Sequence, residues 1–114
     1  MRTEHEQILA RVAGFIERHG DARFSSVTGD ASHVIHNRAG WWRDDADGRT
    51  YLFTSEGLIE ALAGFDLKRG TEALETAGWL VERESSARAV RIRINRTRWR
   101  VYAIRPTDSE AGDA

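Results

Sequence analysis

The chain has 114 residues, of which 40% are hydrophobic and 31% charged, a composition typical of one globular domain. It contains no cysteine, which excludes disulfides, thiolate metal sites and thiol catalysis. No apolar run approaches the roughly 20 residues of a membrane span. The chain opens without a basic-then-apolar leader, so we expect a cytoplasmic protein with no membrane partner.

The net charge of −1 conceals a strong asymmetry along the chain. Residues 82–105 carry eight arginines against two glutamates, whereas residues 1–81 carry nine cations against thirteen acids. The last nine residues add three acids and no cation. Positive charge is therefore concentrated near the C-terminus, and its distribution is more informative than its sum.

The first predicted helix follows Thr3, which forms a capping box with Glu6. Apolar residues then recur at helical spacing as far as Ile16, and Gly20 is expected to end the helix in the left-handed conformation. Residues 33–53 predict a β-hairpin with arms at 33–43 and 49–53. The Asp-Gly pair that ends the connection, residues 44–48, is a strong turn signal.

Two more helices are predicted after this hairpin. Thr54 caps the first, whose buried stripe is expected to contain Leu58, Ile59, Leu62 and Phe65. Asp66 caps the second, whose inner face is expected to contain Leu67, Gly70, Leu74 and Ala77, with Gly78 ending it. The turn between them is very short, so the two helices should cross at a large angle, as in a helix-turn-helix.

The last predicted element is a second hairpin. Val90, Ile92 and Ile94 alternate with arginines, and a returning strand spans residues 99–105. A two-residue turn at Arg96 and Thr97 would place every apolar side chain on one face and set Arg93 opposite Arg100.

The order of elements predicts an α+β fold resembling a winged helix-turn-helix, with three main helices and two β-hairpins. The first hairpin would lie beside the core or add a strand to the sheet of the second. Residues 1–106 would form one domain, and residues 107–114 a disordered acidic tail.

The basic hairpin is the main candidate site. Arginine makes planar, bidentate contacts with phosphate, and like charges opposite each other in a sheet need an anionic partner. The residues predicted to bind nucleic acid are Lys68, Arg69, Arg88, Arg91, Arg93, Arg96, Arg98 and Arg100. The alternative is a solvated face neutralised by Glu82, Glu84 or the acidic tail. Glu72 and Glu75 on the third helix would repel phosphates, so binding tolerant of sequence is expected.

Aromatic residues near these arginines are candidates for stacking or partner contact, namely Trp42 and Tyr102. A metal site is not expected, because His33 and His36 would face opposite sides of a strand. The Asp-rich turn at 44–48 lacks the end positions of a calcium loop. No catalytic motif or cofactor-binding loop occurs, so we expect neither enzymatic activity nor a cofactor.

Five segments resemble a known family: residues 37–43 (NRAGWWR), 51–53 (YLF), 63–66 (AGFD), 77–80 (AGWL) and 100–104 (RVYAI). They are similar to the C-terminal region of primase/helicase-like ATPases of phages, plasmids and integrated islands, whose ATPase part is labelled a domain of unknown function. The resemblance covers residues 8–106 and includes no ATPase motif. It implies a winged-helix accessory domain that engages DNA or a partner during replication of the element.

Two functional hypotheses follow. The first is a nucleic-acid-binding domain, with DNA as the expected partner. The second is a protein-interaction module of a mobile element that contacts a replication protein or blocks a host defence complex.

Overall fold

The computed structural model describes residues 3–29 and 34–107, which form three helices and six strands. In chain order these are α1 (Glu4–His19), β1 (Phe24–Ser26), β2 (Gly40–Asp45), β3 (Gly48–Phe53), α2 (Ser55–Leu62), α3 (Leu67–Thr76), β4 (Leu80–Glu82), β5 (Val90–Ile94) and β6 (Thr97–Ile104). The predicted α+β class is therefore confirmed. Residues 108–114 of the predicted acidic tail lie outside the described residues, as does His33 at the predicted start of the first hairpin.

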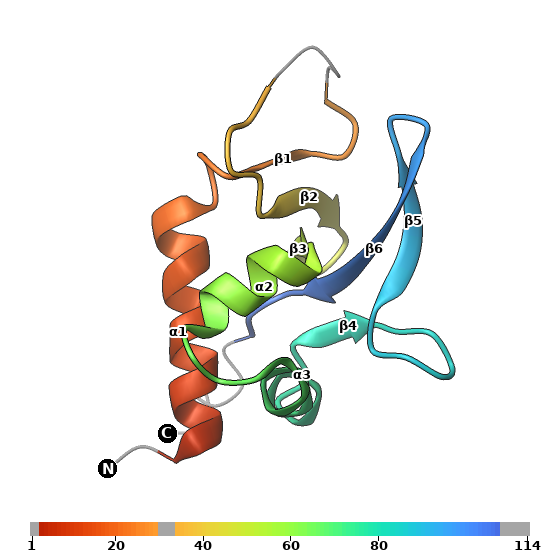
Figure 1. Ribbon diagram of the computed structural model, residues 1–114. Helices are drawn as coiled ribbons and strands as arrows, with labels where there is room; N and C mark the ends of the chain where they lie inside the picture. Colours follow the sequence, from red (N-terminus) through yellow and green to blue (C-terminus); the bar gives the residue numbers. More distant parts are fainter. Residues whose placement is uncertain (1–2, 30–33, 108–114) are drawn as a thin grey trace.

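The strands form one sheet rather than two separate hairpins. Its order is β1-β2-β3-β6-β4, and β5 pairs with β6 off this path. Strand β1 is parallel to β2, and the other pairs are antiparallel. The first hairpin pairs its strand β3 with β6. This confirms the predicted alternative in which the first hairpin adds a strand to the sheet of the second. Figure 1 shows the three helices gathered beside this sheet and the β5–β6 end projecting from it.

The helix starts agree with their predicted caps, because each cap satisfies a backbone N–H that has no helical partner. Thr3, Thr54 and Asp66 accept from backbone N–H groups at 3.1, 3.0 and 2.7 Å. At the C-termini only one prediction holds. Gly78 has the left-handed φ of +79°, whereas Gly20 remains right-handed with φ −59°.

The main core lies between the helices and one face of the sheet. Its fully buried side chains include Ile8, Val12, Phe53, Leu58 and Leu74. Helix α2 runs across the view of Figure 1 while α3 is seen end-on, so the predicted large crossing angle is present. The predicted stripe of α2 was wrong at one position: Ile59 is 51% exposed, because its side chain projects from the helix away from the core.

The first arm of the early hairpin is shorter than predicted. Strand β2 begins at Gly40 instead of residue 33. Asn37 adopts a left-handed backbone with φ 57°, which interrupts an extended strand. The short strand β1 takes the place beside β2, pairing Phe24 with Gly40.

Candidate nucleic-acid interface

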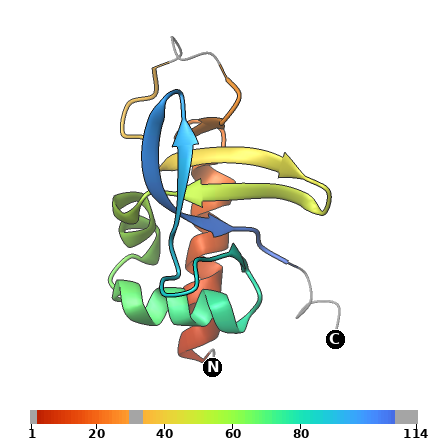
Figure 2. The same cartoon turned by 90° about the vertical axis from the view of Figure 1, so that its right-hand side faces the viewer.

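The arginine-rich hairpin is an extension of strand β6. Residues 102–104 of β6 pair with β3 in the middle of the sheet, whereas residues 97–101 pair with β5 alone. In Figure 2 the resulting arm stands upright and crosses the β2–β3 hairpin at a steep angle. Among the described residues, this arm therefore pairs with no further strand.

The register of this arm differs from the prediction. Ile94 pairs with Thr97 and Arg93 with Arg98, so the turn residues are Asn95 and Arg96, not Arg96 and Thr97. Both turn residues have positive φ, 49° and 72°, as in the two-residue turns that match strand twist. Asn tolerates this conformation far better than the β-branched Thr97. Each residue therefore pairs with a partner two positions away from the predicted one. Because side chains alternate between the two faces, a displacement by two leaves each side chain on its predicted face.

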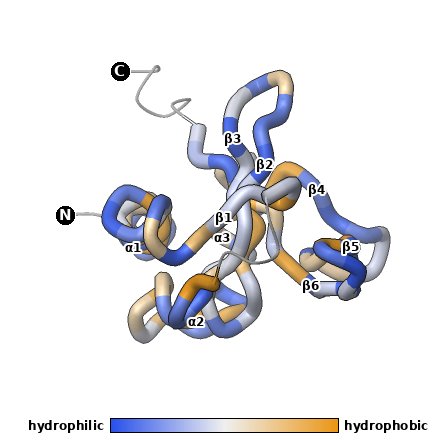
Figure 3. The backbone as a smooth tube through the Cα atoms, turned by 90° about the horizontal axis from the view of Figure 1, so that it is seen from above, coloured by the Kyte–Doolittle hydropathy of each residue, from blue (hydrophilic) through white to orange (hydrophobic). Residues whose placement is uncertain are grey.

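One face of the arm is apolar and packs against the sheet. Val90, Ile94 and Val101 are buried and form a second cluster with Trp41 and Leu52. At the outer end the rings of Trp99 and Trp41 lie 4.7 Å apart. Figure 3 shows that β5 and β6 carry both hydrophobic and hydrophilic residues. Because this face packs against the sheet, the opposite face of the arm points toward solvent.

The outward face carries two cross-strand pairs of arginines, and a fifth arginine lies at the tip. Arg91 is opposite Arg100, and Arg93 is opposite Arg98. All four are exposed, as is Arg96 in the turn. We call these five residues the arginine face. The predicted opposition of Arg93 and Arg100 was wrong, since the turn lies one residue earlier and each cross-strand partner is therefore displaced by two positions.

Ion pairing divides the arginines of the described chain into two groups. Eight of them pair with a carboxylate. Within residues 3–29 and 34–107, the side chains of Arg93, Arg96, Arg98 and Arg100 make no hydrogen bond or ion pair. Four of the five arginines on this face therefore keep all their guanidinium donors available.

The two glutamates that were expected as neutralising partners reach only the base of the arm. Glu84 pairs with Arg91 at 3.3 Å. Hydrogen bonds from the side chain and backbone of Arg91, together with the positive charge of Arg100, lower the pKa of Glu84. Glu82 instead pairs with Arg43 at 2.8 Å. Within the described chain, Arg91 is thus the one member of the arginine face that forms an ion pair.

Helix α3 contributes fewer free cations than predicted. Lys68 is exposed on its first turn, but Arg69 pairs with Glu4 of α1 at 2.9 Å. Arg88 pairs with Glu75 at 3.0 Å, and Glu75 also contacts Arg83. The structure brings Lys68, Arg88 and Arg100 together around an open pocket of about 460 Å³ between α3 and the arm.

Neither predicted stacking residue lies on the arginine face. Tyr102 is only 7% exposed and belongs to the main core. Trp42 is half-buried against that core and is covered by Arg49, whose guanidinium carbon lies 3.6 Å from the ring centroid. The sequence placed Tyr102 on the correct side of its strand, but at that point the side faces the main core instead of solvent.

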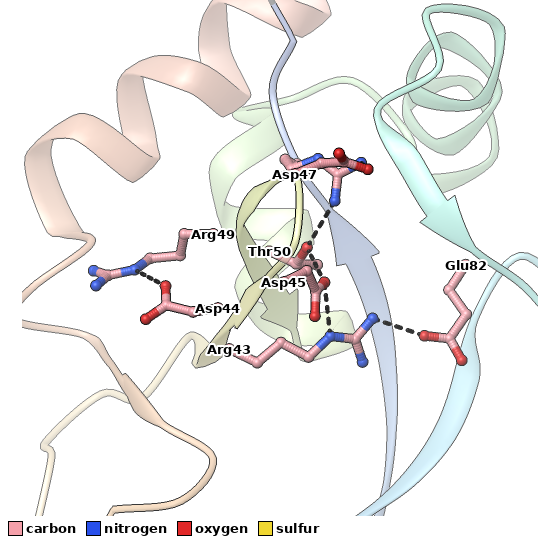
Figure 4. A network of polar contacts seen from close by, with 8 residues as sticks. Arg43, Asp44, Asp45, Asp47, Arg49, Thr50 and Glu82 are labelled. Atoms are coloured by element: carbon pink, nitrogen blue, oxygen red, sulfur yellow. Dashed lines mark hydrogen bonds and ion pairs between the residues drawn. The ribbon is translucent and has the colours of Figure 1, made fainter.

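A polar network that sequence reasoning missed joins three strands beside the arm (Figure 4). Arg43 of β2 donates to Asp45 at 3.1 Å and to Glu82 of β4 at 2.8 Å. The Thr50 hydroxyl of β3 donates to Asp45 at 2.7 Å. These bonds, first that of Thr50 and then that of Arg43, lower the pKa of Asp45. The Arg43–Glu82 pair spans 39 positions, so no local motif predicts it.

We expect Asp45→Asn to lower the free energy of unfolding at neutral pH. The free energy of unfolding of this variant should also depend less on pH in the acid range. A carboxyl whose pKa is lowered by folding stabilises above its unfolded pKa, and this contribution is lost as the pH falls through its folded pKa. The free energy of unfolding of the variant should be about 1 kcal/mol lower at pH 7, because a charged hydrogen bond is weakened at a partly exposed site. Urea denaturation should show the difference from wild type shrinking below about pH 4.

The control for this prediction is Asp44→Asn, which removes the same charge from the same strand at an exposed position. It should leave the pH profile nearly unchanged. Equal effects of the two substitutions would show that the network around Asp45 does not stabilise the sheet.

Other sites and relatives of the chain do not identify its function. Among the described residues, no three His, Asp or Glu side chains gather where they could hold a metal ion. No described helix has the length and apolar character needed to span a membrane. No family model matches the sequence, and no match is found among curated proteins or solved structures. Function must therefore be inferred from the geometry and charge of the arm.

Proposed function

We propose that this domain is a non-enzymatic DNA-binding domain that contacts phosphates through its arginine face. The observation that carries the proposal is the set of four arginines, Arg93, Arg96, Arg98 and Arg100, whose side chains make no hydrogen bond or ion pair in the described chain. Holding like charges opposite each other costs free energy in a sheet. Phosphate groups offset that cost by accepting bidentate hydrogen bonds from guanidinium groups.

The arrangement of elements supports a winged-helix interpretation of the same domain. Helices α2 and α3 cross steeply, and β4 follows α3 directly. Strand β6 returns between β3 and β4, and its extension with β5 would be the wing. In this interpretation α3 would approach the DNA with Lys68, while the arginine face contacts the backbone beside it.

The proposed binding is largely independent of sequence. Phosphate contacts position a protein on DNA without reading bases. Helix α3 adds only Lys68 as an unpaired cation, and its exposed Glu72 would repel phosphates. The resemblance to mobile-element replication proteins extends the proposal to a setting in which the domain holds DNA for a catalytic partner.

Salt dependence tests the proposal. Fluorescence anisotropy with a labelled DNA duplex, from low to physiological salt, should give an affinity that falls steeply as salt rises. Four phosphate contacts predict a log–log slope of about −3.6. The variant Arg18→Gln, which removes an exposed arginine from α1, should bind like wild type. Absence of binding at low salt would overturn the proposal.

A second candidate function is a protein-interaction module. Two observations favour it: Arg69 is held by Glu4, and Ile59 is an exposed apolar side chain on α2. In this case the arginine face would meet acidic side chains of a replication or host defence protein. Recovery from host lysate of one partner that resists nuclease treatment, combined with no DNA binding, would favour this function.

A further inference from the structure

The aromatic side chains near the arm all lie away from the arginine face. Trp99 is on the opposite face of β6, where its ring packs on Trp41. Tyr102 is buried in the main core, and Trp42 is covered by Arg49. Along the described arm, the outward face therefore offers guanidinium groups and no aromatic ring.

This division matters because single strands and duplexes are bound by different chemistry. Proteins that bind single strands stack the exposed bases on aromatic side chains along a basic groove. A duplex keeps its bases stacked inside and presents two phosphate backbones at higher charge density. A surface with arginines and no rings is suited to the second kind of ligand.

The spacing of the arginines also suits two backbones instead of one. The paired arginines belong to different strands of the ribbon, and their Cα atoms lie about 5 Å apart. The pair Arg93–Arg98 is two residues from the pair Arg91–Arg100, roughly 6.8 Å along the arm. Side chains from β5 and β6 can thus diverge to the two backbones that flank a groove, and a two-stranded ribbon fits the major groove.

We infer that the arginine face selects double-stranded over single-stranded DNA. The inference rests on the proposed function, and it adds the class of nucleic acid. Selection comes from the outward face itself, because arginine contributes charge there while the nearby rings lie on the opposite face of the arm, beneath Arg49 or in the core.

The experiment compares one sequence as a duplex and as an unstructured single strand, by anisotropy over a salt series. The duplex should bind about tenfold tighter or more, since only it gains from charge density and the single strand gains no stacking. Equal or tighter binding of the single strand would overturn the inference and leave the proposed function standing. Binding of neither would overturn both.

A pair of variants at one position tests the physical reason. Arg93→Gln and Arg93→Tyr both remove one charge at an exposed strand position, and only the second adds a ring. Tyr should raise single-strand affinity about fivefold or more over Gln, while duplex affinities stay equal. Equal single-strand affinities of the two variants would overturn the inference that missing rings cause the selection.

Discussion

Replacing Arg93, Arg96, Arg98 and Arg100 together by Gln should nearly abolish DNA binding. Each lost phosphate contact removes about 0.9 from the log–log salt slope, so four reduce it by about 3.6. At physiological salt this corresponds to an affinity lower by on the order of a thousandfold. Anisotropy with a labelled duplex, starting at low salt where weak binding remains measurable, gives both the slope and the affinity.

The same variant should fold normally and be slightly more stable than wild type. These four side chains make no hydrogen bond or ion pair among the described residues, and two of them lie opposite each other. Relief of like-charge repulsion is worth about 0.2–1 kcal/mol per cross-strand pair. A variant that binds weakly because it has unfolded would show a lower urea midpoint, and that result would remove the support for direct contact.

A matched control separates position from charge. Arg11→Gln with Arg18→Gln removes two exposed charges from α1, on the side of the fold away from the arm (Figure 1). The corresponding pair on the arm is Arg93→Gln with Arg98→Gln. If both pairs reduced affinity equally, binding would depend on net charge, and the arginine face would not be the site.

Local signals in the sequence predicted the elements well. The caps at Thr3, Thr54 and Asp66 mark all three helix starts, because each is decided by a hydrogen bond within three residues. The apolar alternation of β5 and β6 assigned their faces correctly. Their register was missed by two residues, because a shift of two leaves every face unchanged and the pattern alone cannot exclude it.

Long-range contacts were beyond such reasoning. The sequence identifies Arg88 and Arg91 as basic, but only the fold shows that Glu75 and Glu84 reach them. Likewise Tyr102 alternates with core residues and was predicted to be accessible, yet it is buried in the main core. The candidate site is therefore narrower than predicted, and it moves toward the tip of the arm.

Trp41→Ala should produce the largest loss of stability among the changes considered. Trp41 is 4% exposed and lies at the centre of the second cluster, against Trp99 and below the guanidinium of Arg38. Truncating a buried aromatic residue typically costs about 3–5 kcal/mol. That is a large part of the 5–15 kcal/mol that stabilises an ordinary domain. Urea denaturation should show a much lower midpoint with a similar slope.

The comparison with Trp99→Ala tests whether the second cluster holds the arm against the sheet. Trp99 is 37% exposed and shares the same ring contact, which is worth about 0.5–1.5 kcal/mol. Its removal should cost little stability while freeing the outer arm from the sheet, so DNA affinity falls with all arginines present. Trp41→Phe, which keeps an aromatic partner, should retain most of the stability. Equal costs for Trp41→Ala and Trp99→Ala would mean that Trp41 is not the residue on which the arm rests. An arm held by this pair would bind phosphates with its arginines already oriented, because the apolar face that stabilises it also turns the charged face outward.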